Sequence, residues 1–140
     1  MGARKRNRAE QNKVARENRC QAVLKNCPVS PRKMRLVADL IRGADVNEAL
    51  GILRFSKQDS SRKLEKLLLS AISNWQQKNE GVRIEDSGLF IKEIFVNGSR
   101  TLKRLQTAPQ GRAYRIRKRS NHVTIVLDSA IKNEVENSSN

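Results

Sequence analysis

The segment from Ser99 to His122, SRTLKRLQTAPQGRAYRIRKRSNH, constrains the fold more than any other part of the chain. It contains no acidic residue, alternates basic with apolar side chains and has a Pro-Gln-Gly turn near its middle. A disordered basic tail needs no apolar alternation, and a catalytic loop needs a carboxylate, a usable histidine or a metal cage. The pattern instead predicts two paired strands joined at the turn.

The turn also predicts how the two strands pair. If residues 109–112 form the reversal, Ala108 faces Ala113 and Phe95 comes close to Val126. The hairpin would then continue beyond the core as a two-stranded ribbon of about 40 Å, at roughly 3.3 Å per residue. A free ribbon of that length has no second layer for its apolar residues, so a partner must supply one.

Three short apolar runs have the composition of strands. LFIKEIFV at residues 89–96 and HVTIVLD at residues 122–128 are rich in β-branched and aromatic residues. CQAVLKN at residues 20–26 is shorter and alternates weakly. Together they predict a small antiparallel three-stranded sheet that continues into the long hairpin, about residues 97–122.

Three helices are expected between the first strand and the second. Ser30 stands at an N-cap position, Pro31 takes the first helical turn, and Gly43 follows the last one. Asp45 and Glu48 have capping-box spacing at the start of a second, short helix. The third and longest helix has one apolar stripe, formed by Leu64, Leu67, Leu68, Ala71, Ile72 and Trp75. The predicted fold class is α+β, with three helices packed on the sheet.

The charge indicates a polyanionic partner. Lysine and arginine total 29 against 14 acidic residues, a formal net charge of +15 with a sequence pI near 10.8. Nucleic acid is the first candidate, because basic residues placed at phosphates release counterions, and an anionic membrane surface is the second. No apolar run approaches the roughly 20 residues of a membrane span, and the N-terminus lacks the core of a signal peptide, so we expect no membrane association and a soluble intracellular chain.

The chain divides into one domain with two appendages. Residues 1–19 form a polar, basic extension that should be disordered alone and order on an anionic partner. Residues 20–128 form the globular domain with its hairpin, and residues 129–140 form a polar tail expected to be frayed. The domain's first helix crowds Arg32, Lys33 and Arg35 into a turn where the helix dipole favours anions, which predicts an external phosphate there.

No catalytic, metal or cofactor site is indicated. His122 is the one histidine and has no carboxylate near it in sequence, so a structural or RNA-contacting role is favoured over general-base work. Cys20 and Cys27 lack the further ligands of a zinc site. We expect them to be reduced thiols, with a disulfide between them left open.

Four motifs carry a resemblance to a known family. SPRKMRLVADLIRG, then EAL and IL, then the leucine-rich third helix, and finally IFVNGSRTLKRLQTAPQGRAYRIRKRSNHVTIVL occur in order between residues 20 and 128. In these the chain resembles the bacterial large-subunit ribosomal proteins of the family numbered twenty-two (universal large-subunit protein twenty-two). The resemblance implies a structural, non-catalytic component of the cytoplasmic ribosome. It would bind several domains of large-subunit ribosomal RNA, support its assembly and lie near the exit of the polypeptide tunnel beside neighbouring large-subunit proteins.

The resemblance and the charge pattern together give the candidate site residues. Candidate RNA-binding residues on the first helix and the hairpin are Ser30, Pro31, Lys33, Arg35, Arg100, Lys103, Arg104, Arg112, Arg115, Arg117, Lys118, Arg119 and His122. The residues implied to line the tunnel, near the nascent polypeptide and the macrolide antibiotic region, are Leu102, Lys103, Arg104, Pro109, Gln110 and Gly111.

Two rival functions are compatible with the charge. A basic ribbon with Pro109 as a wedge would also suit an architectural protein that enters the minor groove of DNA. Such a protein would need a dimer, and no further apolar stripe is evident for a dimer seam. An enzyme acting on RNA is the second rival, and it would depend on His122.

Overall fold

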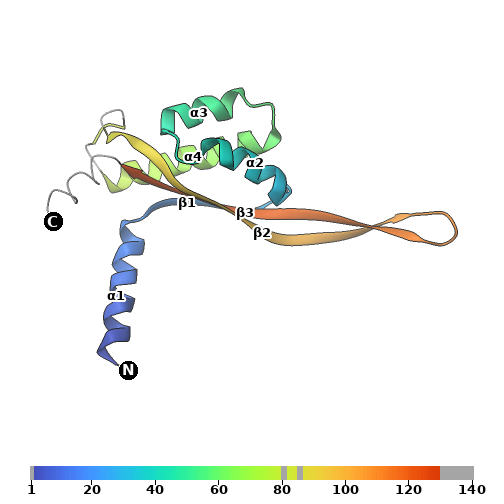
Figure 1. Cartoon of the computed structure of the whole chain (residues 1–140), viewed down its shortest axis with the longest axis horizontal. Coiled ribbons are helices and arrows are strands. Elements are labelled where there is room, and N and C mark those ends of the chain that lie inside the picture. The colour runs from blue at the N-terminus through green and yellow to red at the C-terminus, as the bar shows by residue number, and fades with distance from the viewer. Residues whose placement is uncertain (1, 80–81, 85–86, 130–140) are drawn as a thin grey trace.

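The computed structural model describes residues 2–79, 82–84 and 87–129. Three helices lie over one face of a three-stranded antiparallel sheet, and a fourth extends away on the other side (Figure 1). The sheet order is β1-β3-β2, with β3 in the centre. In chain order the elements are α1 (Ala3–Asn18), β1 (Cys20–Cys27), α2 (Pro31–Ile41), α3 (Val46–Phe55), α4 (Asp59–Lys78), β2 (Leu89–Thr107) and β3 (Ala113–Ser129). The predicted fold class is confirmed.

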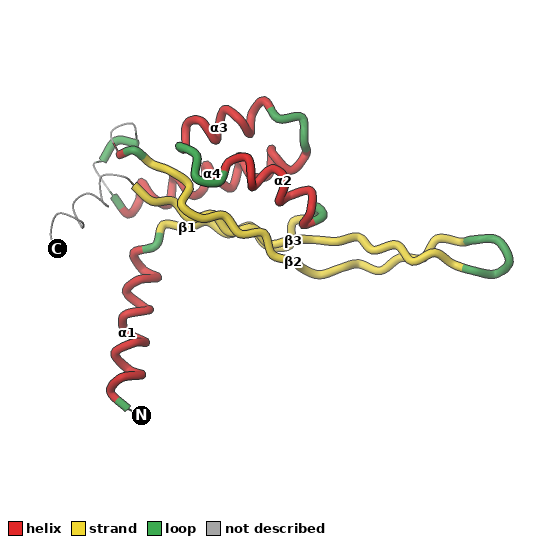
Figure 2. Tube along the Cα trace, viewed as in Figure 1, coloured by secondary structure: helices red, strands yellow, loops and turns green. Residues whose placement is uncertain are grey.

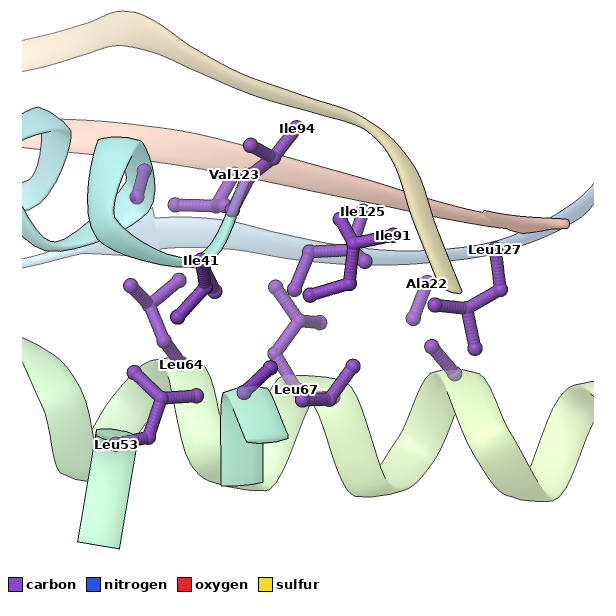
Figure 3. Packing of buried hydrophobic residues seen from close by; sticks show 14 of the residues in the cluster. Ala22, Ile41, Leu53, Leu64, Leu67, Ile91, Ile94, Val123, Ile125 and Leu127 are labelled. Carbon is purple, nitrogen blue, oxygen red and sulfur yellow. The ribbon is translucent and has the colours of Figure 1, made fainter. Parts of the chain in front are cut away.

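The core lies between α4 and the inner face of the sheet (Figure 3). Val123, Ile125 and Leu127 alternate along β3, so all three side chains point toward the helices. Every residue of the predicted α4 stripe is buried, including Trp75 at 4% exposure, which confirms its role as a core anchor. Within the described residues no helix is long and apolar enough to span a membrane.

Helix side chains cover the backbone at both edges of the sheet. An uncovered edge strand presents unpaired carbonyl and N–H groups that invite another chain. Here the donors come from α2 and its C-terminal end on the β2 side, and from α4 on the β1 side. The bonds run from Arg35 to the carbonyl oxygen of Val96 at 2.9 Å, from Arg42 to that of Ile94 at 3.0 Å, from Asn74 to that of Gln21 at 3.0 Å, and from Lys78 to that of Arg19 at 2.9 Å.

The hairpin turn is where it was predicted, but the strands pair one residue out of the predicted register. The Arg112 N–H donates to the Pro109 carbonyl, and the two residues between them, Gln110 and Gly111, have φ of 62° and 70°. Pro109 has no N–H to return that bond, so the Ala108 N–H donates to the Arg112 carbonyl at 3.0 Å. Thr107, and not Ala108, therefore pairs with Ala113.

A β-bulge adds a second shift where the hairpin leaves the core. Ser99 and Arg100 of β2 together lie opposite one residue of β3. Phe95 consequently pairs with Thr124, and its predicted approach to Val126 is wrong. The two shifts have the same sense, so they add to two residues.

The N-terminal segment differs from the expectation for it, and the C-terminal tail is not described beyond its first residue. Residues 3–18 form a helix where a disordered segment was expected. Alanine, arginine, lysine and glutamine favour helix, and the Arg6 and Glu10 side chains form an ion pair one turn apart at 3.7 Å. Ser129 is the last residue of β3, and the rest of the predicted tail lies outside the described residues.

The core and the ribbon should respond differently to loss of an apolar side chain. Leu64 is fully buried, whereas Leu105 in the hairpin is 74% exposed. We expect Leu64→Ala to lower the free energy of unfolding by about 3 kcal/mol, because it leaves a cavity. The matched change Leu105→Ala should alter it by less than about 0.5 kcal/mol. Urea denaturation of both RNA-free proteins measures this, and equal losses would contradict the assignment of the core.

Candidate nucleic-acid interface

The outer part of the hairpin, residues 99–120, is here called the ribbon. Apart from the contact of Ser99 with Asn26 of β1 at its base, no hydrogen bond or ion pair joins it to another described element. None of its residues is buried, and Leu105 and Tyr114 are 74% and 62% exposed. In Figure 2 it extends well beyond the ends of the helices. Its apolar side chains therefore have no layer of this chain to cover them.

Cross-strand pairing gathers cations on one face of the ribbon. Lys103 lies directly opposite Arg117, and Arg115 and Arg119 stand two residues to either side on the same face of β3. Among the described residues no carboxylate forms an ion pair with any of these four. Like charges placed directly opposite one another destabilise a pair of strands, so this face attracts a compensating anion.

The other face of the ribbon mixes apolar and basic side chains. Leu102 pairs with Lys118, Arg104 with Ile116, and Gln106 with Tyr114. A surface hollow of about 590 Å³ lies along the middle of the ribbon. It is lined by Lys103, Arg104, Leu105, Arg115, Ile116 and Arg117. Cations beside apolar surface suit the phosphates and bases of a nucleic acid together.

A small polar network fixes the base of the ribbon. His122 was a predicted site residue, whereas Asn26, Ser99 and Asn121 were not singled out. The backbone N–H of Asn26 donates to Nδ1 of His122 at 3.0 Å, and Ser99 Oγ donates to Oδ1 of Asn26 at 2.9 Å. Asn26 has φ of 54°, a left-handed conformation that asparagine tolerates better than most residues. Asn121 is fully buried and donates to the Val29 carbonyl at 2.7 Å. His122 thus holds two strands together.

The N-terminal end of α2 is the second candidate contact. Ser30 occupies the predicted N-cap position and Pro31 the first helical position, but the Ser30 side chain makes no capping hydrogen bond. A hollow of about 510 Å³ lies here, between the starts of α2 and α4, and Lys33 lines it. The N–H groups at a helix start favour an anion. At the start of α4, a hydrogen bond from Lys63 lowers the pKa of Asp59.

Arg35 has a structural contact that sequence reasoning did not foresee. Its Nε and Nη2 groups donate to the Val96 carbonyl oxygen at 3.3 and 2.9 Å. A guanidinium has five N–H groups, so three remain for another partner. Arg42, which was not singled out, makes the equivalent bond to Ile94.

Comparison with known proteins decides the family. The family model for ribosomal protein L22p/L17e matches residues 22–128. The chain belongs to this family. It is 64% identical to the large ribosomal subunit protein uL22 of Flavobacterium johnsoniae over 138 residues, which cover 99% of this chain and all of the relative. The protein of the same name from Bacteroides fragilis is 58% identical over 98% of this chain and all of its own length. That of Porphyromonas gingivalis is 59% identical over 92% of this chain and 96% of its own.

Membership of this ribosomal protein family confirms that the chain is not an enzyme, since its relatives are structural ribosomal proteins. Cys20 and Cys27 are both buried, and burial raises the pKa of the Cys27 thiol. Within the described residues no group of three potential metal ligands is found.

The contact of Arg35 with β2 predicts a loss of stability without RNA. We expect Arg35→Ala to lower the free energy of unfolding of the ribosomal protein by about 1 to 2 kcal/mol, because the Val96 carbonyl loses a charged donor. Arg32→Ala is the matched control, since Arg32 lies in the same turn and is exposed. It should change stability by less than about 0.5 kcal/mol. Equal values in chemical denaturation would show that the Val96 contact contributes nothing.

Proposed function

We propose that this large-subunit ribosomal protein binds large-subunit ribosomal RNA, supports the assembly of that RNA and lines the nascent-polypeptide exit tunnel with its ribbon. Its family and relatives support the place in the large subunit. The observation that carries the RNA contact is the opposition of Lys103 and Arg117 on an exposed ribbon without a neighbouring layer. Phosphates on both sides of the ribbon would supply the missing charge and the missing layer.

Recognition by the ribbon would depend on RNA shape. An RNA helix hides the base edges of its major groove, so side chains meet mainly phosphates, 2′-hydroxyls and unstacked bases. Arg115, Arg117 and Arg119 suit bidentate phosphate contacts, while Tyr114 and the leucines are exposed for stacking and apolar contact. Arg100 in the bulge and Lys118 on the mixed face extend the same basic surface to the base of the ribbon.

The globular domain would add a phosphate contact of its own. The start of α2 has Ser30, Pro31 and Lys33 beside an open hollow, with no acidic residue in the first turn. Arg35 would reach RNA with the N–H groups that Val96 leaves unused. His122 lies 3.0 Å from the Asn26 amide, so its own contribution to RNA binding is to hold the ribbon base in position.

The tip of the ribbon has the character expected of a tunnel wall. Pro109, Gln110 and Gly111 carry no charge, and Arg112 donates to the Gln110 side chain at 3.0 Å. The uncharged side chains of residues 109–111 would attract a nascent chain only weakly, while the Arg112 guanidinium is bonded to Gln110. Leu102 to Arg104 lie further back, exposed on β2, and would lie at the tunnel constriction and the macrolide region. Neighbouring large-subunit proteins near the exit are the remaining proposed partners.

Removing charge from the ribbon should weaken RNA binding in a salt-dependent manner. In a plot of log affinity against log salt concentration, the slope is negative. We expect the triple variant Arg115→Gln, Arg117→Gln, Arg119→Gln to make it shallower by about 2 to 3, since each phosphate contact contributes roughly 0.7 to 0.9. Filter binding to large-subunit ribosomal RNA measures the slope. The control variant Arg54→Gln, Lys57→Gln, Lys66→Gln removes the same charge from exposed positions on and beside α3 and α4 and should leave it unchanged. Equal slopes for both variants would count against the ribbon as an RNA contact.

Deleting residues 102–104 tests the proposed tunnel lining separately. The core contains none of these residues, so thermal unfolding of the RNA-free protein should stay within about 2 °C of the wild type. Ribosomes containing the variant should show altered chemical reactivity of RNA around the macrolide site and altered macrolide sensitivity. Normal reactivity and sensitivity would refute the tunnel placement, and unfolding of the whole domain would refute the assignment of the core.

A further inference from the structure

The N-terminal helix α1 is a helix without a packing surface. Every one of its described side chains is exposed, and its one large apolar residue, Val14, is 55% exposed. It projects from the sheet on the side opposite α2, α3 and α4 (Figure 1). An isolated helix of about this length is marginal in water. It also lies outside residues 22–128, the part matched by the family model, so it is an addition to the shared core.

The residue that joins α1 to the sheet is held by two other elements. The Arg19 side chain pairs with Glu93 of β2, and its carbonyl oxygen accepts a hydrogen bond from Lys78 Nζ of α4 at 2.9 Å. These contacts restrain the point at which α1 leaves the body. The direction of the helix is therefore set by the fold at its base, while the described side chains along its length are all exposed.

Basic side chains occupy one broad face of α1, here called the α1 cationic face. At 3.6 residues per turn, Arg4, Lys5, Arg8 and Arg16 fall within about a third of the circumference, with Asn12 among them. None of these four cations forms an ion pair with a described carboxylate. Arg4 and Arg8 are one turn apart, an arrangement that destabilises an isolated helix through like-charge repulsion.

The opposite face of α1 has a different character. Ala3, Asn7 and Val14 lie there. Glu10 lies at the centre of that face and pairs with Arg6, and Lys13 is on the same side, so this face carries both signs of charge. A helix that lies on a membrane needs bulky apolar residues along one face, and α1 has a single valine. Four of its six basic residues share one face and its apolar surface is small, which fits a partner that presents closely spaced phosphates.

We propose that the α1 cationic face is a second RNA-binding site, which contacts the phosphates of a segment of large-subunit ribosomal RNA that the ribbon does not reach. The proposal rests on the proposed function, since it takes ribosomal RNA as the partner. β1 begins at Cys20 opposite Leu127, whereas the ribbon begins beyond Asn121, about 20 Å away along β3. α1 then extends a further 24 Å or so, at about 1.5 Å per residue. The globular domain lies between the two contacts and would hold them at a fixed separation.

The test is hydroxyl-radical footprinting of large-subunit ribosomal RNA with the full-length protein, together with the salt dependence of binding. The variant Arg4→Gln, Arg8→Gln, Arg16→Gln keeps good helix formers and removes three charges from the α1 cationic face. It should lose one discrete set of protected nucleotides. The nucleotides whose protection is lost in the variant at positions 115, 117 and 119 should stay protected, and the dependence of log affinity on log salt should become shallower by about 2. The control variant at positions 54, 57 and 66 should keep both sets.

The possible results separate this proposal from the proposed function. An α1 variant with the wild-type footprint and slope would overturn the second site while leaving ribbon binding intact. Absence of any protection by the wild-type protein would overturn both. Binding of the wild type to phosphatidylglycerol vesicles that is lost in the α1 variant, with an unchanged RNA footprint, would assign the helix to a membrane surface instead. Circular dichroism and thermal unfolding of each variant confirm that a lost footprint is not a lost fold.

Discussion

The position of the ribbon depends on β3, because this strand is packed in the core at one end and forms half of the ribbon at the other. From Asn121 to Leu127 this strand is the centre of the sheet, paired with β1 on one side and β2 on the other. Its inward side chains pack on the helices, and burial of such side chains is the main stabilising term in a domain of this size. From Ala113 to Ser120 the same strand has one partner strand and no covering layer. The ribbon is therefore fixed at its base by the packed sheet, while its own apolar side chains remain exposed to solvent.

The helices and the sheet could be predicted because their signals are local. Apolar spacing and end signals at Ser30, Gly43 and Asp45 located α2 and α3 to within a residue or two, and Asp45 does accept the capping bond from Asn47. Strand register depended on two interruptions. The first, the missing N–H of Pro109, is visible in the sequence. The second, the bulge at Ser99 and Arg100, arises where the ribbon leaves the sheet, and no local sequence pattern predicts it.

The basic positions of the candidate interface could also be read from the sequence, but their individual roles could not. Alternation placed the ribbon cations on faces, yet which of them oppose one another followed only from the true register. The bond of Arg35 to Val96 required knowing which sheet edge α2 covers. α1 was expected to be disordered because low hydrophobicity argues against a packed core. That criterion does not apply to a helix whose described side chains are all exposed.

The repulsion built into the ribbon has a consequence before any ribosome exists. Its two strands have open outer edges from the bulge to the tip, and open edges of two newly made copies tend to add to one another and aggregate. A second copy would bring Lys103, Arg115, Arg117 and Arg119 against the same residues of the first, at a high electrostatic cost. The charges suited to phosphate therefore also keep unassembled chains apart, and the protection ends once RNA covers the ribbon.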